Sequence, residues 1–475
     1  MRGPDEQLVN AWRLLVTHLR AVVRARLGGA DHFRLAYNPP TVNSASVPGN
    51  SLGTIPPSSS YNGYMRSCWT LLLSLTLVAG SLSCASDLAL TGAKVYPSPL
   101  DPPIENGSVL IHDGHILALG PSSATKIPRA ARVIDCKGLV VTAGFWNSHV
   151  HILPPALLHA RDSGAKELDQ QLEILFNRWG FTTVFDITSV LDNTLALRRR
   201  IEGGALRGPR ILTVGEPVWT IEPVYVRDFL QQNHIHIPNI QTPQQAIALV
   251  RDHAAEGADG IKLFAVSDQG GGKGAVLPLA IAKAAVEEAH RHGMPVFAHP
   301  STLEGVMIAV DSGVDVLAHT VPQSPPWTPD FAVRLLRANL SLIPTLTLFD
   351  FEGRKWATSD KEREAWVGQM VDQLRVYSQA GGDVLFGTDV GYTDHYDTTL
   401  EFTLMSQAGM SYEQILASLT TNPARKFKDS GRTGRIAKGM NADLVVLGAD
   451  PAQDVRAFSK VRYTIRNGNV IYQER

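Results

Sequence analysis

Two histidines separated by one residue, His149 and His151, are the first residues of this 475-residue chain whose types and spacing could do chemistry. They end a short apolar run that is typical of a β-strand. Because alternate residues of a strand project to the same side, both imidazoles can reach one metal ion while Val150 points away. The pair therefore predicts part of a metal site. Spacing alone does not single it out, since His234 and His236 repeat the pattern.

Lys262 is a second unusual residue, because it interrupts the apolar segment Gly-Ala-Asp-Gly-Ile-Lys-Leu-Phe. A buried ammonium group is costly and repels cations. The neutral amine can instead react with carbon dioxide to form a carbamate, an anionic oxygen ligand that is able to bridge two metal ions. The alternative is a lysine that reaches solvent or pairs with a carboxylate.

Three more candidates, His299, His319 and Asp389, come at the ends of apolar segments. Taken singly, each histidine is more often a structural residue than a ligand. A set of four histidines, one lysine and one aspartate at strand ends, in the correct order, makes coincidence a poor explanation. By contrast, His290 and His292 lie near the end of a predicted helix, where the helix dipole and solvent explain them.

The elements that must position these residues are β-type segments that alternate with helical patterns. Eight candidate strands lie near residues 146–152, 182–187, 210–214, 260–266, 295–299, 314–319, 340–346 and 384–388. Such alternation predicts parallel βα units, and eight of them predict a closed α/β barrel. The working groups of such barrels lie at the carboxyl ends of the strands, on one face. The candidate residues would therefore meet in one mouth of the barrel.

Loops around that mouth supply weaker candidates. His234 and His236 follow no suitable strand and precede a predicted helix that begins at Thr242-Pro243. We expect them to lie in a solvated loop that could touch substrate. Tyr392 and His395 lie on the loop after the eighth strand and could contact substrate. A surface position is an equal alternative for His395.

The segments that flank the predicted barrel have a different pattern. Residues 87–143 and 436–475 consist of short apolar runs broken by turns, with hairpin signals at His112-Asp113-Gly114 and Asn467-Gly468. They predict the two parts of one small composite β-sandwich domain built from both chain ends. The metal-binding barrel would span residues 144–435.

The first 86 residues predict an extension and a targeting signal. Residues 1–64 combine one helical pattern with a Pro-, Ser- and Asn-rich stretch, which predicts an upstream extension that is disordered or weakly helical. Residues 65–86 have the layout of a secretory signal peptide, and their apolar run is short for a membrane span. We expect an exported protein, periplasmic or extracellular, without an integral membrane span when mature. Lipid attachment at Cys84 is a further hypothesis, and a genuine N-terminal arm with a short anchor is the alternative.

The composition excludes several kinds of partner. Lys and Arg number 44 against 45 Asp and Glu, so no global charge favours nucleic acid, an anionic membrane or an acidic partner. Three cysteines are too few for a disulfide framework or a thiolate zinc site, so imidazole and oxygen ligands must hold any metal. The expected partner is a small-molecule amide or peptide substrate. The sequence is compatible with a homo-oligomer.

From about Asp87 to its end, the chain resembles members of the amidohydrolase superfamily. The likeness rests on Gly-Phe-Trp-Asn-Ser-His-Val-His, Gly-Phe-Thr-Thr-Val and Gly-Thr-Asp at strand ends, then Thr-Asn-Pro-Ala-Arg and Gly-Arg-Ile-Ala-Lys-Gly-Met-Asn-Ala-Asp-Leu-Val-Val. The chain is most similar to the imidazolonepropionase-like and prolidase-type branch. The resemblance implies a distorted (β/α)8 TIM barrel with a composite β-sandwich, and usually zinc. One departure, Ala143-Gly144 where Pro-Gly is common, affects a turn and no ligand.

The resemblance also implies a binuclear centre of two divalent ions. Its ligands would be His149, His151 and Asp389 for the more buried ion, His299 and His319 for the other, and carboxylated Lys262 with a hydroxide between them. Asp389 would act as general base and then as general acid toward the leaving nitrogen.

The leading hypothesis is hydrolysis of an amide C–N bond by that bridging hydroxide, with a dipeptide, as in prolidases, or an N-acyl amino acid as substrate. One alternative is a mononuclear hydrolase or deaminase of a cyclic amide, imidazolonepropionase-like, in which Lys262 is unmodified. A second alternative is an exported binding protein without catalysis. Metal stoichiometry separates the first two, and a failure to hydrolyse any amide, lactone or ester would favour the third.

Overall fold

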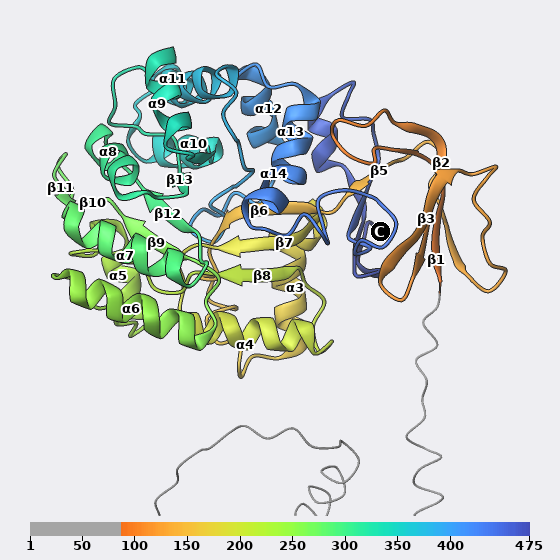
Figure 1. Ribbon diagram of the computed structural model, residues 1–475, viewed down its shortest axis with the longest axis horizontal. Coiled ribbons are helices and arrows are strands. Elements are labelled where there is room, and N and C mark those ends of the chain that lie inside the picture. Colours follow the sequence, from red (N-terminus) through yellow and green to blue (C-terminus); the bar gives the residue numbers. More distant parts are fainter. Residues whose placement is uncertain (1–86) are drawn as a thin grey trace, which may run out of the picture. The chain divides into compact units, whose positions relative to one another are not determined.

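One part of the molecule contains parallel β-strands with helices around them (Figure 1). The computed structural model describes residues 87–475. One parallel sheet contains β6 (Phe145–Val150), β7 (Phe181–Asp186) and β8 (Arg210–Thr213), and a second contains β9 (Ile261–Phe264), β12 (Val296–His299), β13 (Val316–Ala318) and β14 (Ser341–Ile343). These strands occupy seven of the eight predicted positions.

Isolated bridges join the two sheets into a ring. Val218, shortly after β8, pairs with Leu263 of β9. On the other side, residues 384–390 take the place of the eighth strand: Val384 pairs with β14, and Val390 pairs with β6. The prediction of a distorted (β/α)8 barrel is confirmed, and the distortion lies largely in this irregular eighth segment.

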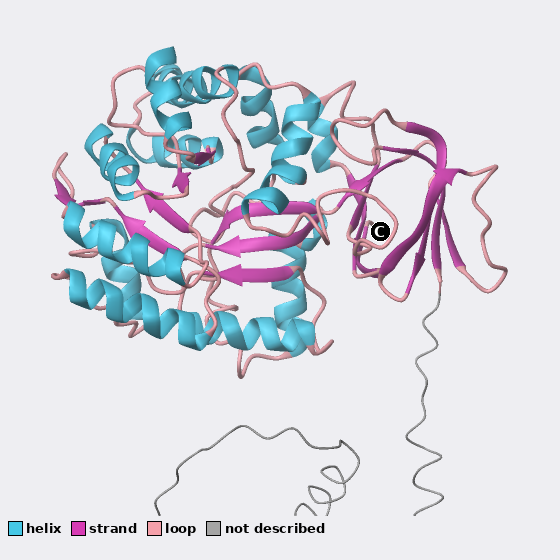
Figure 2. Cartoon of the chain, viewed as in Figure 1, coloured by secondary structure: helices cyan, strands magenta, loops and turns pink. Residues whose placement is uncertain are grey.

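Helices lie around the barrel strands (Figure 2). They are α3 (Ala165–Leu175), α4 (Leu191–Glu202), α5 (Val224–Gln232), α6 (Pro243–Glu256), α7 (Leu279–Arg291), α8 (Leu303–Ser312), α9 (Pro329–Arg337), α10 (Leu346–Trp356), α11 (Asp360–Gln379), α12 (Thr399–Gln407), α13 (Tyr412–Leu419) and α14 (Thr421–Lys426), with short 3-10 turns at Asn177–Trp179 and Val455–Ser459. The predicted start of α6 is present, because Thr242 caps the helix and Pro243 occupies its first position.

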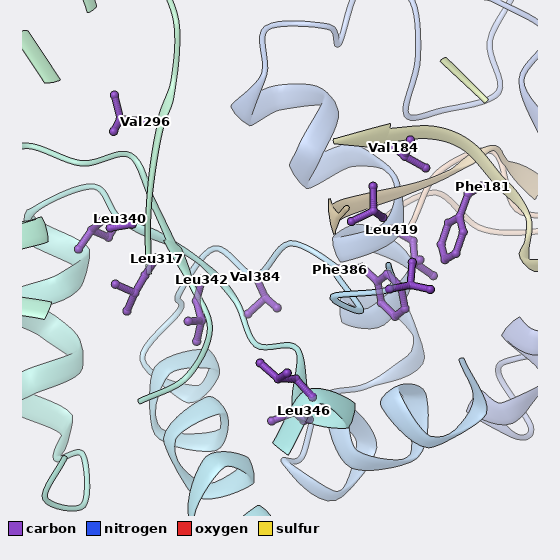
Figure 3. Close-up of a cluster of buried hydrophobic side chains, with 14 of the residues drawn as sticks. Phe181, Val184, Val296, Leu317, Leu340, Leu342, Leu346, Val384, Phe386 and Leu419 are labelled. Atoms are coloured by element: carbon purple, nitrogen blue, oxygen red, sulfur yellow. The ribbon is translucent and has the colours of Figure 1, made fainter. Parts of the chain in front are cut away.

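Apolar side chains pack against both faces of the barrel strands and hold the ends of the strands in position. Side chains inside the barrel form a buried cluster of Phe185, Ile187, Val214, Phe297, Val316, Ala318, Ile343 and Leu385. A larger cluster packs the outside of the strands against the helices, and Figure 3 shows part of it, including Leu317, Leu342 and Phe386. Burial of each such side chain contributes about 1.5–3 kcal/mol. With the interior filled, polar side chains gather at the strand ends.

Strands from both chain ends form a separate sheet. Its members are β1 (Leu88–Val95), β2 (Ile104–His112), β3 (His115–Pro121), β4 (Arg132–Asp135), β5 (Val140–Ala143), β15 (Leu444–Leu447), β16 (Val461–Arg466) and β17 (Asn469–Gln473). Their order is β17-β16-β15-β5-β1-β2-β3, with β4 beside β1. Asn467 and Gly468 have φ angles of 47° and 74°, as a tight hairpin turn requires. The composite β domain is therefore present.

The N-terminal predictions concern a part of the chain that lies outside the described residues. They cover the extension at 1–64, the signal peptide at 65–86, export and lipid attachment at Cys84, and they stay predictions. Within residues 87–475, no helix has the length and apolar character needed to cross a membrane.

Candidate metal centre

Three predicted residues from distant parts of the chain meet at the mouth of the barrel. His149 on β6, His319 after β13 and Asp389 in the eighth segment are buried, and one potential ligand atom of each lies within 4.8 Å of the others. Nε2 of His149 lies 3.3 Å from the Asp389 carboxylate, and Nε2 of His319 lies 3.9 Å from it. Ligands of one tetrahedral zinc ion, each about 2.0–2.2 Å from the metal, have comparable separations.

The backbone at two of these residues is unusual. His319 has a φ of 103° and Asp389 a φ of 60°, both in the left-handed region. A non-glycine residue in such a conformation costs about 1–3 kcal/mol and persists where the surrounding structure holds it. Backbone strain of this kind is concentrated at functional sites.

His151 also faces Asp389 and is held in one orientation. Its Nδ1–H donates to the carbonyl oxygen of Thr188 at 2.8 Å. That Nε2 lies 2.8 Å from Oδ1 of Asp389. A histidine whose second nitrogen donates to a carbonyl is oriented as metal-binding histidines usually are.

His299, at the end of β12, extends the group on the other side. Its ring centroid lies 4.8 Å from that of His319, whose ring in turn lies 4.5 Å from that of His149. Phe264 of β9 stacks on His299 with a centroid separation of 4.9 Å. The four predicted histidines therefore form one continuous group.

Lys262 projects from β9 and is 1% exposed. Burial lowers the pKa of its amine to about 7, and Asp389 opposes this shift through its charge alone. Among residues 87–475, no carboxylate lies within ion-pair distance of this amine. A large fraction of Lys262 is thus neutral at physiological pH, which is the form that reacts with carbon dioxide.

Burial keeps the imidazoles in the neutral form that binds metals. It lowers the pKa of His149 and of His299 to about 3, and holds the pKa of His319 well below its usual range. For Asp389, burial alone would raise the pKa of the carboxyl group. His149 and His151 instead hold this pKa well below the usual range. The group therefore presents neutral nitrogens and a carboxylate anion.

Unpartnered atoms test whether this group fits a metal ion. Within the described part of the chain, Nδ1 and Nε2 of His149 and Oδ1 of Asp389 are buried without a hydrogen-bond partner. Leaving such a group unsatisfied costs about 1–3 kcal/mol, and more when it is charged. A divalent cation would satisfy Nε2 of His149 and the carboxylate together. The donor set of imidazole nitrogens and carboxylate oxygen fits zinc.

The loop histidines lie elsewhere. His234 and His236 follow α5, are exposed, and do not belong to the buried group. His234 has a φ of 55°, typical of a turn. The expectation of a solvated loop agrees with this exposure.

Tyr392 and His395 lie in a partly aromatic cluster after the eighth segment. The Tyr392 hydroxyl donates to Glu352 at 2.7 Å, and its ring lies 5.5 Å from that of Tyr225 and 6.2 Å from that of Phe351. The His395 ring lies 5.8 Å from Phe351. Burial, aided by nearby acidic charges that include Asp389, raises the pKa of Tyr392. Tyr392 therefore keeps its hydroxyl proton, and the negative charge of Asp389 contributes to this.

Sequence reasoning missed several residues around this centre. Tyr225 and Phe351 lie on helices that follow barrel strands, and their position after β8 and β14 could have singled them out. Thr345 contacts Nδ1 of His319 at 2.7 Å, and Glu401 is buried beside it. A single threonine or glutamate in a helical pattern carries no signal of such a contact.

Comparisons with known proteins agree with this arrangement. A family model described as the amidohydrolase family matches residues 140–471. A Xaa-Pro dipeptidase with bound methionine in its active site has a similar structure, with 22% identity, a TM-score of 0.70, and coverage of 82% of this chain and 100% of that one. A prolidase complexed with N-methylphosphonate-L-proline gives 22% identity, a TM-score of 0.67, and coverage of 82% and 100%. At this identity the likeness establishes the fold.

One relative by sequence is an uncharacterized protein of Mycobacterium tuberculosis (strain ATCC 25618 / H37Rv). It is 24% identical over 223 residues, which amount to 45% of this chain and 58% of that protein. The match therefore spans less than two thirds of that relative's length.

Proposed function

Since this chain belongs to the amidohydrolase family and is a metal-dependent hydrolase of carbon–nitrogen bonds, we propose that it cleaves the amide bond of a dipeptide or an N-acyl amino acid. The observation that carries the proposal is the buried group at the barrel mouth, whose Asp389 and His149 have unpartnered atoms. The prolidases among the structural neighbours support the substrate class.

Two divalent ions, of which zinc is the best match, would be held by this group. The proposed ligands are His149, His151 and Asp389 for one ion, His299 and His319 for the other, and a carbamate on Lys262 for both. When bound, such ions lower the pKa of a water molecule to about 7 and polarise the scissile carbonyl. A mononuclear site would leave the burial of Lys262 unexplained, so the binuclear alternative is preferred.

The carbamate would form from the Lys262 amine and carbon dioxide, with water as the proton acceptor. The neutral Lys262 amine attacks carbon dioxide, an N–C bond forms, and the nitrogen loses one proton to water. The product carries one negative charge, whereas the amine that reacted carried none. It would thus add an anion to a group in which Asp389 is otherwise the one negative ligand.

Asp389 would move the proton during catalysis. Its buried Oδ1 has no hydrogen-bond donor, so it can accept the proton of the attacking water and then deliver it to the leaving nitrogen. Nε2 of the His151 imidazole lies 2.8 Å from that oxygen. Tyr392 and His395, together with Tyr225, would contact the substrate at the rim.

Metal removal provides a direct test. The protein beginning near Asp87 should contain about two zinc ions per chain, and chelation should abolish hydrolysis of dipeptides and N-acyl amino acids, which zinc then restores. Metal quantification measures the number of ions per chain, and assays on a panel of amides, lactones, esters and cyclic imidazolones measure the hydrolytic activity. One ion with full activity on a cyclic amide would support the mononuclear alternative. A zinc-loaded protein that hydrolyses nothing in the panel would count against the proposed substrates.

The pH dependence of reconstitution follows from Lys262. Carbamate formation needs the neutral amine, and burial lowers the pKa of this amine to about 7. At a fixed concentration of dissolved carbon dioxide, the activation rate of metal-free protein should rise about tenfold per pH unit below 7 and level off above it. Activity recovered after addition of zinc and carbon dioxide measures this rate. A rate that keeps rising to pH 10 would indicate an ordinary, solvated lysine.

A further inference from the structure

We propose that Glu401, on helix α12, is a positioning residue for His319, which it holds in its metal-binding tautomer through Thr345 and the first turn of helix α10. The inference rests on the proposed function, since His319 is there a metal ligand. It concerns residues that do not themselves touch metal or substrate. Each step is a contact between buried residues.

The first step joins His319 to Thr345. The Thr345 hydroxyl lies 2.7 Å from Nδ1 of His319 and donates its one hydrogen to the carbonyl oxygen of Pro344 at 2.9 Å. With its hydrogen on that carbonyl, the hydroxyl oxygen accepts from the imidazole, and Nδ1 carries the proton in this arrangement. Nε2 is then unprotonated on the side that faces Asp389, 3.9 Å away. Thr345 thereby selects the tautomer that can bind a metal ion.

The second step concerns the start of helix α10. Thr345 occupies the position just before the helix, where a threonine hydroxyl ordinarily accepts a hydrogen bond from the first turn. Here it makes no such bond, and its backbone is left-handed with φ 45° and ψ 52°. A β-branched residue in this conformation is strained by about 1–3 kcal/mol. Another group must therefore hold this turn in place.

Glu401 supplies the missing cap from another helix. Its Oε1 accepts from the backbone N–H of Leu346 at 2.9 Å, and its Oε2 accepts from the backbone N–H of Thr347 at 2.7 Å. The Thr347 hydroxyl donates to the same Oε2 at 2.8 Å. These are the donors that the first turn leaves free, and the helix dipole favours an anion there. The carboxylate fixes the two residues that directly follow Thr345.

Comparison with other helices of the molecule shows that this cap is unusual. Helices α11 and α13 are capped by their own preceding serines, Ser359 and Ser411, without help from another helix. Glu401 is fully buried, and burial raises its pKa to about 7 despite the three donors. A local hydroxyl would satisfy the helix without this desolvation cost. The local hydroxyl of α10 is instead turned toward His319, which accounts for the remote carboxylate.

The test compares Glu401→Gln with Thr345→Val and Thr345→Ser in the full chain. A glutamine keeps the size of Glu401 but places an NH2 group against one of the backbone donors, and valine removes only the hydroxyl. The measurements are zinc affinity by competition with a chromophoric chelator, and hydrogen exchange of residues 341–356. Glu288→Gln is the control, because Glu288 is a buried carboxylate on the outer helix α7 that pairs with Arg251.

We expect Glu401→Gln and Thr345→Val each to weaken one of the two zinc sites by about 10- to 100-fold, the usual effect of losing a partner of a metal-binding histidine. Thr345→Ser should bind zinc as the wild type does. The double variant should be little worse than either single one, because both break the same chain of contacts. Faster exchange in residues 341–356 is expected for Glu401→Gln and not for Glu288→Gln.

The outcomes separate this inference from the proposed function. Glu401→Gln with both zinc affinities unchanged, whatever its melting temperature, overturns the inference. If Glu401→Gln does not fold, Thr345→Val with unchanged zinc affinities overturns it equally. A wild-type protein that binds no zinc overturns the proposed function, and the inference with it.

Discussion

Replacing Lys262 by alanine should abolish binding of the second metal ion and reduce amide hydrolysis by about a thousandfold or more. The physical reason is charge. Burial leaves the imidazoles of His149, His299 and His319 neutral, and Asp389 supplies one negative charge. Two divalent ions in a buried site need a second anion, and the carbamate on Lys262 is the one proposed. Loss of an ion that stabilises the transition state by several kcal/mol corresponds to that factor.

The measurement is metal content per chain together with kcat/KM on the best substrate. Lys273→Ala is the matched control, because Lys273 is an exposed lysine in the hairpin that connects β10 (Val266–Asp268) to β11 (Gly274–Val276), in the loop after β9. It should retain both the metal content and the activity of the wild type. A Lys262→Ala protein with two ions and unchanged activity would refute the carbamate as a ligand of the centre.

Replacing Asp389 by asparagine should lower kcat by about 10²- to 10⁴-fold, the usual contribution of a positioned general acid or base. An amide cannot accept the proton of the attacking water at neutral pH. The fold should survive, because asparagine tolerates the left-handed backbone that Asp389 adopts at a φ of 60°. The neighbouring histidines hold the pKa of Asp389 well below its usual range, so its anion stabilises the metal-free fold, and the change should lower the melting temperature of that form.

Because Asp389 is also a proposed ligand, this experiment needs kcat at saturating zinc, the metal content and the melting temperature of the metal-free form. Asp394→Asn on the same loop is the control, since Asp394 is exposed. It should behave as the wild type. An Asp389→Asn enzyme within tenfold of wild-type kcat, with its metal present, would show that another group moves the proton.

Local pattern was sufficient for the barrel and for the residues at its mouth. Strand alternation puts His149 and His151 on one side of β6, and the strand-end rule selected His299, His319 and Asp389. The hairpin at Asn467-Gly468 was equally local, because two residues with positive φ are needed there. These predictions depend on short-range geometry, which the order of residues carries.

Other features could not be predicted because they depend on packing between distant segments. The eighth barrel segment, residues 384–390, is irregular because its pairs with β6 and β14 are isolated bridges. A strand pattern cannot indicate how continuous its pairing will be.

By itself the sequence determined which residue types stand at the ends of the barrel strands, because side-chain direction alternates along a strand and parallel strands end at one face. Only the tertiary structure decided which contacts orient those residues and how burial shifts their pKa values. The contact of Thr345 with His319 spans 26 residues and that of Glu401 with Leu346 spans 55. Such contacts, and the burial that lowers the pKa of the Lys262 amine to about 7, arise when separate elements pack together and exclude water.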